Sequence, residues 1–363
     1  MSQLALEGLP TGRTTDAAAR DVVQVRELQP ADFCRWDEFV SGCHEATFFH
    51  RSGWKTVIEQ AFGHRTHFLY AEAGGRIEGV LPLAEVKSLL FGHTLVALPF
   101  CVYGGTAADS ERARGVLDEA ACALARRQRV DHLEYRCLAP RRSEWSRSDL
   151  YVTFRKSIDA DPERNLLAIP RKQRAMVRKG IKNGLRGEFD TDVERFFALF
   201  AENVHRQGTP TLPKRYFELL RRAFGEDCRV LTVLDAAGTP VSSVLTFYWR
   251  DEVLPYYAGD ALAARELAAN DFKYWELMRD GAARGYRLFD YGRSKRGTGS
   301  YDFKKNWGFE PQPLHYEYLL IRGKRVPEHN PLNPKYRLFI KLWQRMPLRL
   351  ANLIGPHVVK SLG

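Results

Sequence analysis

Ala61-Phe62-Gly63 ends a segment with the apolar spacing of an amphipathic helix, and the same three residues return as Ala223-Phe224-Gly225 at the end of another such segment. The two copies lie 162 positions apart (223 − 61). After each comes a predicted strand, a tight turn and a second predicted strand. The turns are Gly74-Gly75 and Ala237-Gly238, and glycine accepts the positive φ that a short hairpin needs. This repeat decides the fold, because it predicts two copies of one structure in a single chain.

The match between the two copies continues along the chain in the same order. Its further pairs are an apolar strand closed by Tyr103-Gly104-Gly105 or Tyr257-Ala258-Gly259, a helix at 111–127 or 271–284, and a short strand at 133–135 or 289–291. The offset falls to 156 (289 − 133), as loop insertions would cause. Each copy therefore reads helix, helix, β-hairpin, strand, helix, strand. This order predicts an α/β (α+β) fold in which a mixed sheet is flanked by helices.

The repeat divides the chain into four expected parts. Residues 1–25 are predicted to be a flexible tail, 26–158 the first domain, 159–326 the second domain with a basic helix at its entry, and 327–363 a basic amphipathic extension. The 363 residues suffice for two domains, and 44% hydrophobic residues can fill the core of each.

Charge and cysteine content narrow the class of protein. The chain has 55 lysines and arginines against 44 aspartates and glutamates, a net charge of +11. This surplus favours a polyanionic partner, such as a phosphorylated substrate, nucleic acid or an anionic membrane, or serves only solubility. Six cysteines without a CxxC pair or metal-ligand spacing suit a reducing compartment. Neither a secretory h-region nor a run of about 18 apolar residues is present, so we expect a cytoplasmic protein that contacts a membrane at most peripherally.

Four segments make the chain resemble the Fem family of peptidoglycan aminoacyltransferases over about residues 30–320. They are PFCVYGG at 99–105, RKQRAMVRKG at 171–180, DYG at 290–292 and, the most specific, YDFKKNWGF at 301–309. The chain is especially similar to Fem-related proteins found with exopolysaccharide and exosortase (PEP-CTERM) loci. The resemblance implies two tandem domains of the N-acetyltransferase (GNAT) type. The coiled-coil arm of some Fem proteins is absent, and the basic extension lies outside the family core.

The same resemblance implies a catalytic residue. Fem proteins transfer an amino acid from aminoacyl-tRNA to an amine of a peptidoglycan precursor. Phe303-Lys304 matches the family's Phe-Lys pair, whose lysine is assigned to stabilising the oxyanion. A cation aimed at developing charge in a water-poor cleft contributes several kcal/mol. From composition alone, Lys304 would be a surface lysine of a short helix, beside Lys305. Lys305 is expected to contact the substrate.

A basic loop at 291–300 precedes this helix. Its glycines allow backbone N–H groups to converge, and Arg293, Lys295 and Arg296 favour phosphate. The loop is therefore either a pyrophosphate site or an ordinary solvated loop. The acyl-CoA pattern R/Q-x-x-G-x-G/A is missing after the strand at 254–257, which weighs against CoA as the donor.

One aspartate and three tyrosines complete the predicted site. Asp290 ends an apolar strand and either accepts the amine proton or forms an ion pair that orients Arg293. Tyr103, Tyr256 and Tyr257 are expected at the ends of equivalent strands facing a groove. A phenol offers an apolar face and one hydrogen-bonding tip, which suits a sugar or nucleotide, and packing at the strand ends is the alternative.

Arg171, Arg174 and Arg178 form one stripe of a predicted helix. Because like charges on one face repel, the stripe predicts contact with phosphates of the substrate or of tRNA, and a solvated face is the alternative. No Ser-His-Asp order, HExxH or P-loop is visible, and the histidines show no metal cluster. We expect neither DNA as a partner nor a bound metal.

The C-terminal extension combines aromatic and basic residues at helical spacing over about 334–345. This combination suits an anionic membrane interface. We therefore expect 331–363 to contact the inner membrane, and docking onto the protein's own body is the alternative.

The sequence thus predicts an N-acyltransferase without a cofactor. It would transfer an aminoacyl or acyl group to an amine of a phosphorylated, lipid-linked envelope precursor. One alternative is an acyl-CoA-dependent acetyltransferase of exopolysaccharide biosynthesis. The other is a non-catalytic scaffold that binds glycan or lipid.

Overall fold

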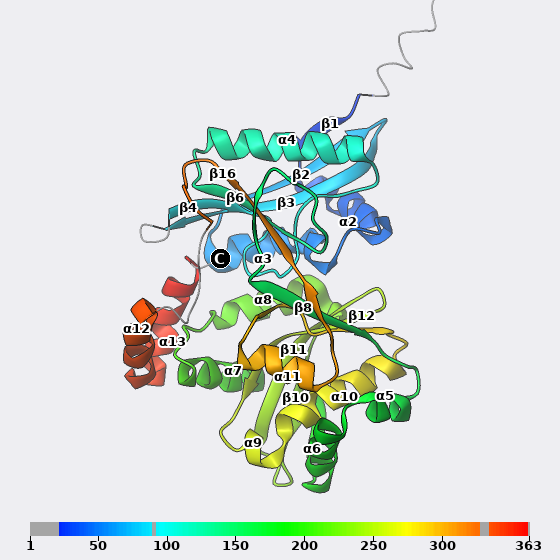
Figure 1. Ribbon diagram of the computed structural model, residues 1–363, viewed down its shortest axis with the longest axis vertical. Coiled ribbons are helices and arrows are strands. Elements are labelled where there is room, and N and C mark those ends of the chain that lie inside the picture. Colours follow the sequence, from blue (N-terminus) through cyan, green and yellow to red (C-terminus); the bar gives the residue numbers. More distant parts are fainter. Residues whose placement is uncertain (1–21, 89–91, 327–333, 362–363) are drawn as a thin grey trace, which may run out of the picture.

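The computed structural model describes residues 22–88, 92–326 and 334–361. Two eight-stranded mixed sheets form two layers, with helices between them and outside them (Figure 1). Most of the predicted tail 1–25 lies outside the described residues, but its end does not follow the prediction, because β1 begins at Gln24.

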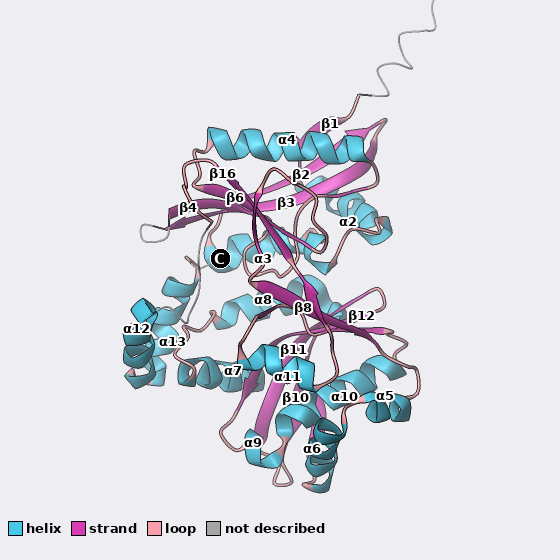
Figure 2. Cartoon of the chain, viewed as in Figure 1, coloured by secondary structure: helices cyan, strands magenta, loops and turns pink. Residues whose placement is uncertain are grey.

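The first sheet has the strand order β1-β2-β3-β4-β6-β16-β7, with β5 beside β3. Its helices cover both faces, with α4 on the outer face and α2 and α3 on the face toward the second sheet (Figure 2). The elements are β1 (Gln24–Glu27), α2 (Phe33–Gly42), α3 (Gly53–Phe62), β2 (Thr66–Ala73), β3 (Arg76–Ser88), β4 (Gly92–Val96), β5 (Ala107–Ala108), α4 (Glu111–Arg127), β6 (His132–Cys137), β7 (Ser146–Ser148) and β16 (His315–Leu320), with short 3₁₀ turns at Pro30–Asp32 and Phe48–His50.

The second sheet has the order β14-β8-β13-β12-β11-β10-β9, with β15 beside β8. Helices α7 and α8 pack on the face toward the first domain, and α10 packs on the other. The elements are β8 (Tyr151–Ser157), α5 (Pro162–Ala168), α6 (Arg171–Lys182), β9 (Arg186–Asp190), α7 (Glu194–Arg206), α8 (Lys214–Phe224), a 3₁₀ turn at Gly225–Asp227, β10 (Cys228–Leu234), β11 (Pro240–Trp249), β12 (Glu252–Asp260), α9 (Ala264–Leu267), α10 (Ala269–Ala283), β13 (Leu288–Asp290), β14 (Ser294–Lys295), α11 (Gly299–Asn306) and β15 (Pro311–Pro313).

Helices α3 and α8 carry the repeated tripeptide and join the domains. Each buries apolar residues at helical spacing and ends at a glycine with positive φ. The two helices pack together between the sheets. The Phe62 ring lies 5.1 Å from that of Tyr216, and the Phe224 ring lies 5.3 Å from that of Trp54, measured between centroids. Phe62 and Phe224 thus occupy corresponding places, and the predicted tandem fold is confirmed.

The last strand of each copy crosses to the opposite sheet. β8 follows the first domain in the chain but pairs with β13 of the second, and β16 follows the second domain but pairs with β6 of the first. The boundaries 26–158 and 159–326 therefore need correction, because β8 belongs to the second sheet and β16 to the first. Sequence order could not reveal this exchange, since both sheets offer the strand an equivalent antiparallel edge.

The C-terminal extension forms α12 (Pro334–Arg345) and α13 (Leu348–Val359), which dock beside α7. The side-chain amide of Gln344 donates to the Arg206 carbonyl at 2.9 Å, and Trp343 is buried. Docking onto the body, the alternative of the sequence analysis, is thus present in the structure. In the described part of the chain, no helix combines the length and apolarity needed to cross a bilayer.

Candidate functional site

The parallel strands β12 and β13 pair only over Glu252–Val253 and Leu288–Phe289. Beyond this point β12 bulges, because Leu245 on β11 pairs with Tyr257 while the next residue, Thr246, pairs with Pro255. The bulge leaves Tyr256 without a strand partner and re-aims its side chain. The Tyr256 hydroxyl donates to the Phe100 carbonyl of the first domain at 2.8 Å.

A cavity of about 410 Å³ lies where these strands separate, and we call it the Arg293 cavity. Its walls come from six parts of the chain, one of which is the loop at 209–212 after α7. They include Tyr256 and Tyr257 of β12, Tyr291, Gly292 and Arg293 after β13, Phe200 and Val204 of α7, Phe100 and Val102 of the first domain, and Val359 of α13. The cavity therefore joins both domains and the C-terminal extension.

Arg293 supplies a positive charge to this cavity. One of its terminal nitrogens donates to the Tyr316 hydroxyl at 2.9 Å, and its guanidinium lies 4.7 Å from the centre of the Tyr151 ring. Among the described residues, no carboxylate lies within 4.0 Å of its guanidinium nitrogens. Arginine stays charged at all physiological pH values, so the site is suited to an anionic ligand. The hydroxyls of Tyr257 and Tyr216 lie 3.0 Å apart, and one hydrogen of this pair remains for a ligand.

Lys304 on α11 holds the loop that carries Arg293. Its ammonium group donates to the carbonyls of Tyr291, Gly292 and Arg293 at 2.7, 3.0 and 3.2 Å. Burial lowers the pKa of Lys304 to about 7, with Asp290 opposing that effect. An ammonium group has three hydrogens. The predicted direct contact with an oxyanion would therefore require one of these bonds to be released.

Asp290 is fully buried and its carboxylate is saturated. It accepts hydrogen bonds from the Tyr103 hydroxyl (2.7 Å), the Thr153 hydroxyl (3.2 Å) and the Gly292 N–H (2.7 Å), and its ion-pair partner is Arg155 (3.2 Å). Arg155 also pairs with Glu252, whose pKa burial raises to about 7 against the opposing charge of Arg155. The sequence analysis named Arg293 as the ion-pair partner, and the structure corrects this to Arg155.

Phe303 faces a different cavity, of about 420 Å³, which we call the Phe303 cavity. Met176 of α6 and Asp271 of α10 also line it. The Phe303 ring lies 6.3 Å from that of Tyr291, measured between centroids, and Tyr291 lines the Arg293 cavity. Phe303 therefore lines the Phe303 cavity, whereas Lys304 turns toward the carbonyls of the 291–293 loop.

Helix α6 carries the predicted basic stripe, and it contributes Met176, not an arginine of the stripe, to the lining of the Phe303 cavity. Arg171 and Arg178 are exposed, and Arg174 donates to the Leu167 carbonyl at 3.0 Å. Within the described ranges, none of the three forms an ion pair. None of the three arginines lines the Phe303 cavity or the Arg293 cavity, and their contact with phosphates stays a prediction.

The remaining predicted residues are only partly brought together. Lys295 lies 5.7 Å from the same Tyr151 ring as Arg293, and burial together with the charge of Arg293 lowers its pKa to about 8. Arg296 is exposed and donates to the Asp149 carbonyl, and Lys305 is exposed beside Tyr301. The predicted phosphate site of three loop cations is therefore not assembled.

Tyr103 also departs from its predicted place. It follows β4, which ends at Val96, whereas Tyr257 lies within β12. The bond from Tyr103 to Asp290 still brings it to the junction of the domains. Sequence reasoning missed Thr153 and Arg155, because they reach Asp290 only through the exchange of β8. Polar residues inside an otherwise buried strand were the available signal.

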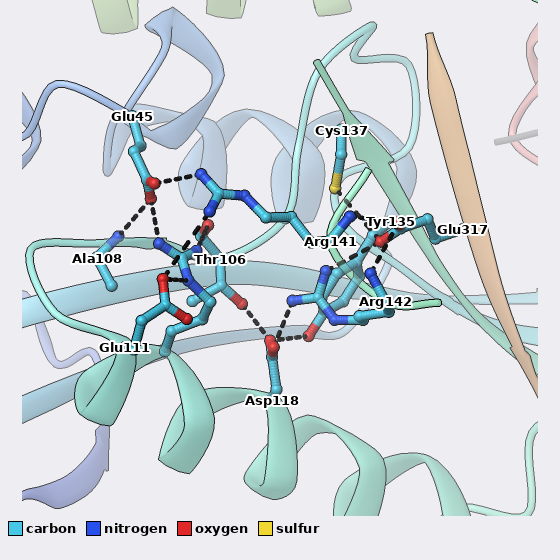
Figure 3. A network of polar contacts seen from close by, with 12 residues as sticks. Glu45, Thr106, Ala108, Glu111, Asp118, Tyr135, Cys137, Arg141, Arg142 and Glu317 are labelled. Atoms are coloured by element: carbon cyan, nitrogen blue, oxygen red, sulfur yellow. Dashed lines mark hydrogen bonds and ion pairs between the residues drawn. The ribbon is translucent and has the colours of Figure 1, made fainter. Parts of the chain in front are cut away.

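A first-domain cavity of about 440 Å³ corresponds to the Arg293 cavity. It is lined by the loop after α2 and by the segment after β6, as the Arg293 cavity is lined by the loop after α7 and the segment after β13. Four of its five lining arginines form ion pairs, and Figure 3 shows those of Arg141 and Arg142. The fifth, Arg250, donates to the backbone carbonyls of Val40, Ser41 and Cys43. Arg142 contacts Glu317 at 3.1 Å as well as Asp118, and Arg141 contacts Glu45. In the residues that the structure describes, no group of histidine, cysteine, aspartate or glutamate could hold a metal ion.

Comparisons with known proteins agree with the fold. Residues 171–305 match the family model of the acetyltransferase (GNAT) domain. A search of curated proteins found no match. The chain carries a GNAT domain, and the protein is an acyltransferase of the GNAT type.

Three solved structures share the fold of nearly the whole chain. FemX is 14% identical, with a TM-score of 0.65 over 87% of this chain and all of FemX. The C-terminal domain of a putative lysylphosphatidylglycerol synthetase from Agrobacterium fabrum is 13% identical, with a TM-score of 0.54 over 79% of this chain and 91% of that one. A tandem GNAT protein from the clavulanic acid biosynthesis pathway is 14% identical, with a TM-score of 0.53 over 84% of this chain and all of the other. At these identities the likeness establishes the fold alone.

Proposed function

We propose that the protein transfers an aminoacyl or acyl group to an amine of a phosphorylated, lipid-linked cell-envelope precursor, of peptidoglycan or exopolysaccharide, at the cytoplasmic face of the inner membrane. The observation that carries this proposal is the charge of Arg293, which faces a cavity between the domains without a carboxylate partner in the described residues. Arg293 is half-buried, and a charge that faces a cavity without an anionic partner is suited to an anionic ligand. The phosphate of the acceptor would supply that anion.

In the proposed reaction, the uncharged amine attacks the carbonyl carbon of the donor. A C–N bond forms, the bond from the carbonyl carbon to the donor's ester oxygen breaks, and the amine proton leaves through solvent to the released hydroxyl. Lys304 supports this step by holding the 291–293 loop and by adding a buried positive charge beside it. Asp290 orients the same loop through the Gly292 N–H.

The proposed donor is aminoacyl-tRNA. Helix α6 supports this proposal, because Arg171 and Arg178 are exposed, form no ion pair within the described residues, and suit a chain of phosphates. The second candidate donor is acetyl-CoA, which is favoured by the match to an acetyltransferase family model.

Transfer to an amine-bearing polyprenyl diphosphate precursor tests both donors, supplied separately. We expect turnover with aminoacyl-tRNA only, because the acyl-CoA pattern is missing after β12. Turnover with acetyl-CoA alone would establish the second candidate instead.

The same assay tests Lys304. Lys304→Ala is expected to lower kcat by about 10²–10³, or about 2.7–4 kcal/mol, with a smaller change in KM, because oxyanion charge develops only in the transition state. Lys305→Ala, at an exposed lysine of the same helix, is expected to lower kcat much less than Lys304→Ala. A fully active Lys304→Ala would remove Lys304 from the mechanism.

A further inference from the structure

The inner face of the two C-terminal helices packs against the body of the protein. Trp343 and Ala351 are buried, and the His205 ring donates to the Met346 carbonyl at 2.9 Å. At the far end of α13, the His64 ring donates to the Lys360 carbonyl at 2.9 Å. These contacts hold the helix pair against α7 and the end of α3, so the opposite face has a defined orientation on the protein.

The outer face exposes large apolar side chains that no part of the described chain covers. Of the ten large hydrophobic residues that are exposed in the described ranges, five fall within fifteen positions of this segment: Phe339, Leu342, Leu348, Leu350 and Leu353. Leu353 has 68% of its surface exposed and Leu342 has 58%. Single exposed leucines are common, but a cluster of this kind marks an interaction surface.

The positive charge of the segment favours an anionic partner. From residue 329 to 363 the sequence contains six lysines and arginines and no aspartate or glutamate. Lys341, Arg345, Arg349 and Lys360 are exposed, and within the described residues none of them forms an ion pair. Leucines interleaved with unpaired cations, without any acidic residue, match a bilayer with anionic headgroups, in which the leucines enter the acyl boundary and the cations meet the headgroup charge.

We propose that the outer face of α12 and α13 docks the protein on an anionic bilayer and places the Arg293 cavity at the lipid surface. Val359, the last residue of α13, is a wall of that cavity. A phosphate attached to a membrane lipid would therefore arrive next to Arg293 without leaving the interface. The choice of acceptor rests on the proposed function, but the lipid binding does not.

Co-sedimentation of the full chain with phosphatidylcholine vesicles, with and without phosphatidylglycerol, tests the surface. We expect binding only to the vesicles that contain phosphatidylglycerol. The triple variant Leu348→Ser/Leu350→Ser/Leu353→Ser should bind these vesicles with an affinity about tenfold lower or weaker still, because it removes apolar area from the interface. Leu353→Ser alone should weaken binding, whereas Leu167→Ser, at an equally exposed leucine of α5 (61%), should not.

Binding by the triple variant equal to that of the wild type, or a wild type that binds neither kind of vesicle, would overturn the proposal. Thermal unfolding of each variant, which should match that of the wild type, verifies that the fold is intact. Acyl transfer to a water-soluble amine should survive the triple substitution. Loss of lipid binding and loss of catalysis are therefore separate results, and failure of one proposal would not be mistaken for failure of the other.

Discussion

The two domains differ in the groups that surround the space beside their parallel strands. In each, a parallel strand pair, β4 with β6 or β12 with β13, is short and leaves space beside it. In the first domain, the chain after β4 folds back, Gly104 pairs with Arg136, and the Arg136 guanidinium donates to the carbonyls of Leu98 and Cys101. In the second domain, β12 instead runs on to Asp260, and the Arg293 cavity lies beside it.

The arginines beside these two spaces differ in whether a carboxylate pairs with them. Arg136 pairs with Glu134 at 2.7 Å, and Arg142 pairs with Glu317 at 3.1 Å, whereas Arg293 has no carboxylate partner in the described part of the chain. A satisfied buried pair contributes to the architecture, and an unsatisfied charge facing a cavity is available for a ligand. This contrast supports the proposal that the second copy binds the substrate, while the paired charges of the first copy serve the architecture.

The largest effect is expected when a fully buried carboxylate is removed from the ion-pair network of the first domain. Glu317 is fully buried on the exchanged strand β16, and Glu317→Ala would leave Arg142 with only Asp118 as its partner. We expect a loss of about 3–5 kcal/mol in the free energy of unfolding, measured with urea. Glu111→Ala, which removes a carboxylate that is 81% exposed, should cost less than about 1 kcal/mol. Equal losses would show that the buried network is not structural.

The next largest effect is expected on the stability at acidic pH, through His50 of the first domain. Its two ring nitrogens bond to Thr47 and to the Gly105 carbonyl, and burial lowers its pKa to about 4. An unfolded histidine has a pKa near 6.5, so between pH 6.5 and 4 the unfolded chain takes up a proton that the folded chain does not. As the pH is lowered through this window, the free energy of unfolding should decrease by up to about 1.4 kcal/mol per pH unit.

His50→Gln should lower this slope, as measured by urea unfolding at a series of pH values. The corresponding position of the second domain, at the same offset of 162 (212 − 50), is Leu212, which does not titrate. An unchanged slope in the variant would mean that other groups govern the acid sensitivity.

In the second domain, the expected loss concerns binding rather than folding. Arg293→Gln should weaken binding of a phosphorylated acceptor by about 1.5–3 kcal/mol, the typical value of a hydrogen bond to a charged group, with little change in thermal stability. Arg141→Gln, in the first-domain cavity, is the matched control and should bind normally. Isothermal titration of both variants would decide this, and equal weakening by the two substitutions would contradict the contrast between the cavities.

The smallest effect is expected at α6, which has no counterpart in the first domain. Substituting Arg171, Arg174 and Arg178 with glutamine should flatten the dependence of log K on log salt for tRNA by about 0.7–0.9 for each lost phosphate contact. Fluorescence anisotropy at several salt concentrations measures that slope. If the slope did not change, the stripe would be a solvated face.

The local features of this protein could be predicted from the sequence. The repeated helix ends, the Gly74-Gly75 hairpin and the short helix carrying Lys304 depend on spacing and backbone preference within a few residues, and the structure has all three. The basic helix over 171–182 belongs to the same class, since its stripe is set by the helical period alone.

Only the tertiary structure decided which charges are satisfied. Asp290 obtains its partners from Tyr103, Thr153 and Arg155, more than 130 positions away in the chain, and two of the three arrive through the exchanged strand β8. Likewise, Lys304 turns toward three carbonyls, and Arg293, rather than Lys304, faces the cavity. A sequence records the charge of a residue, but the energy of that charge depends on burial and on neighbours that only the folded chain brings within a few ångströms.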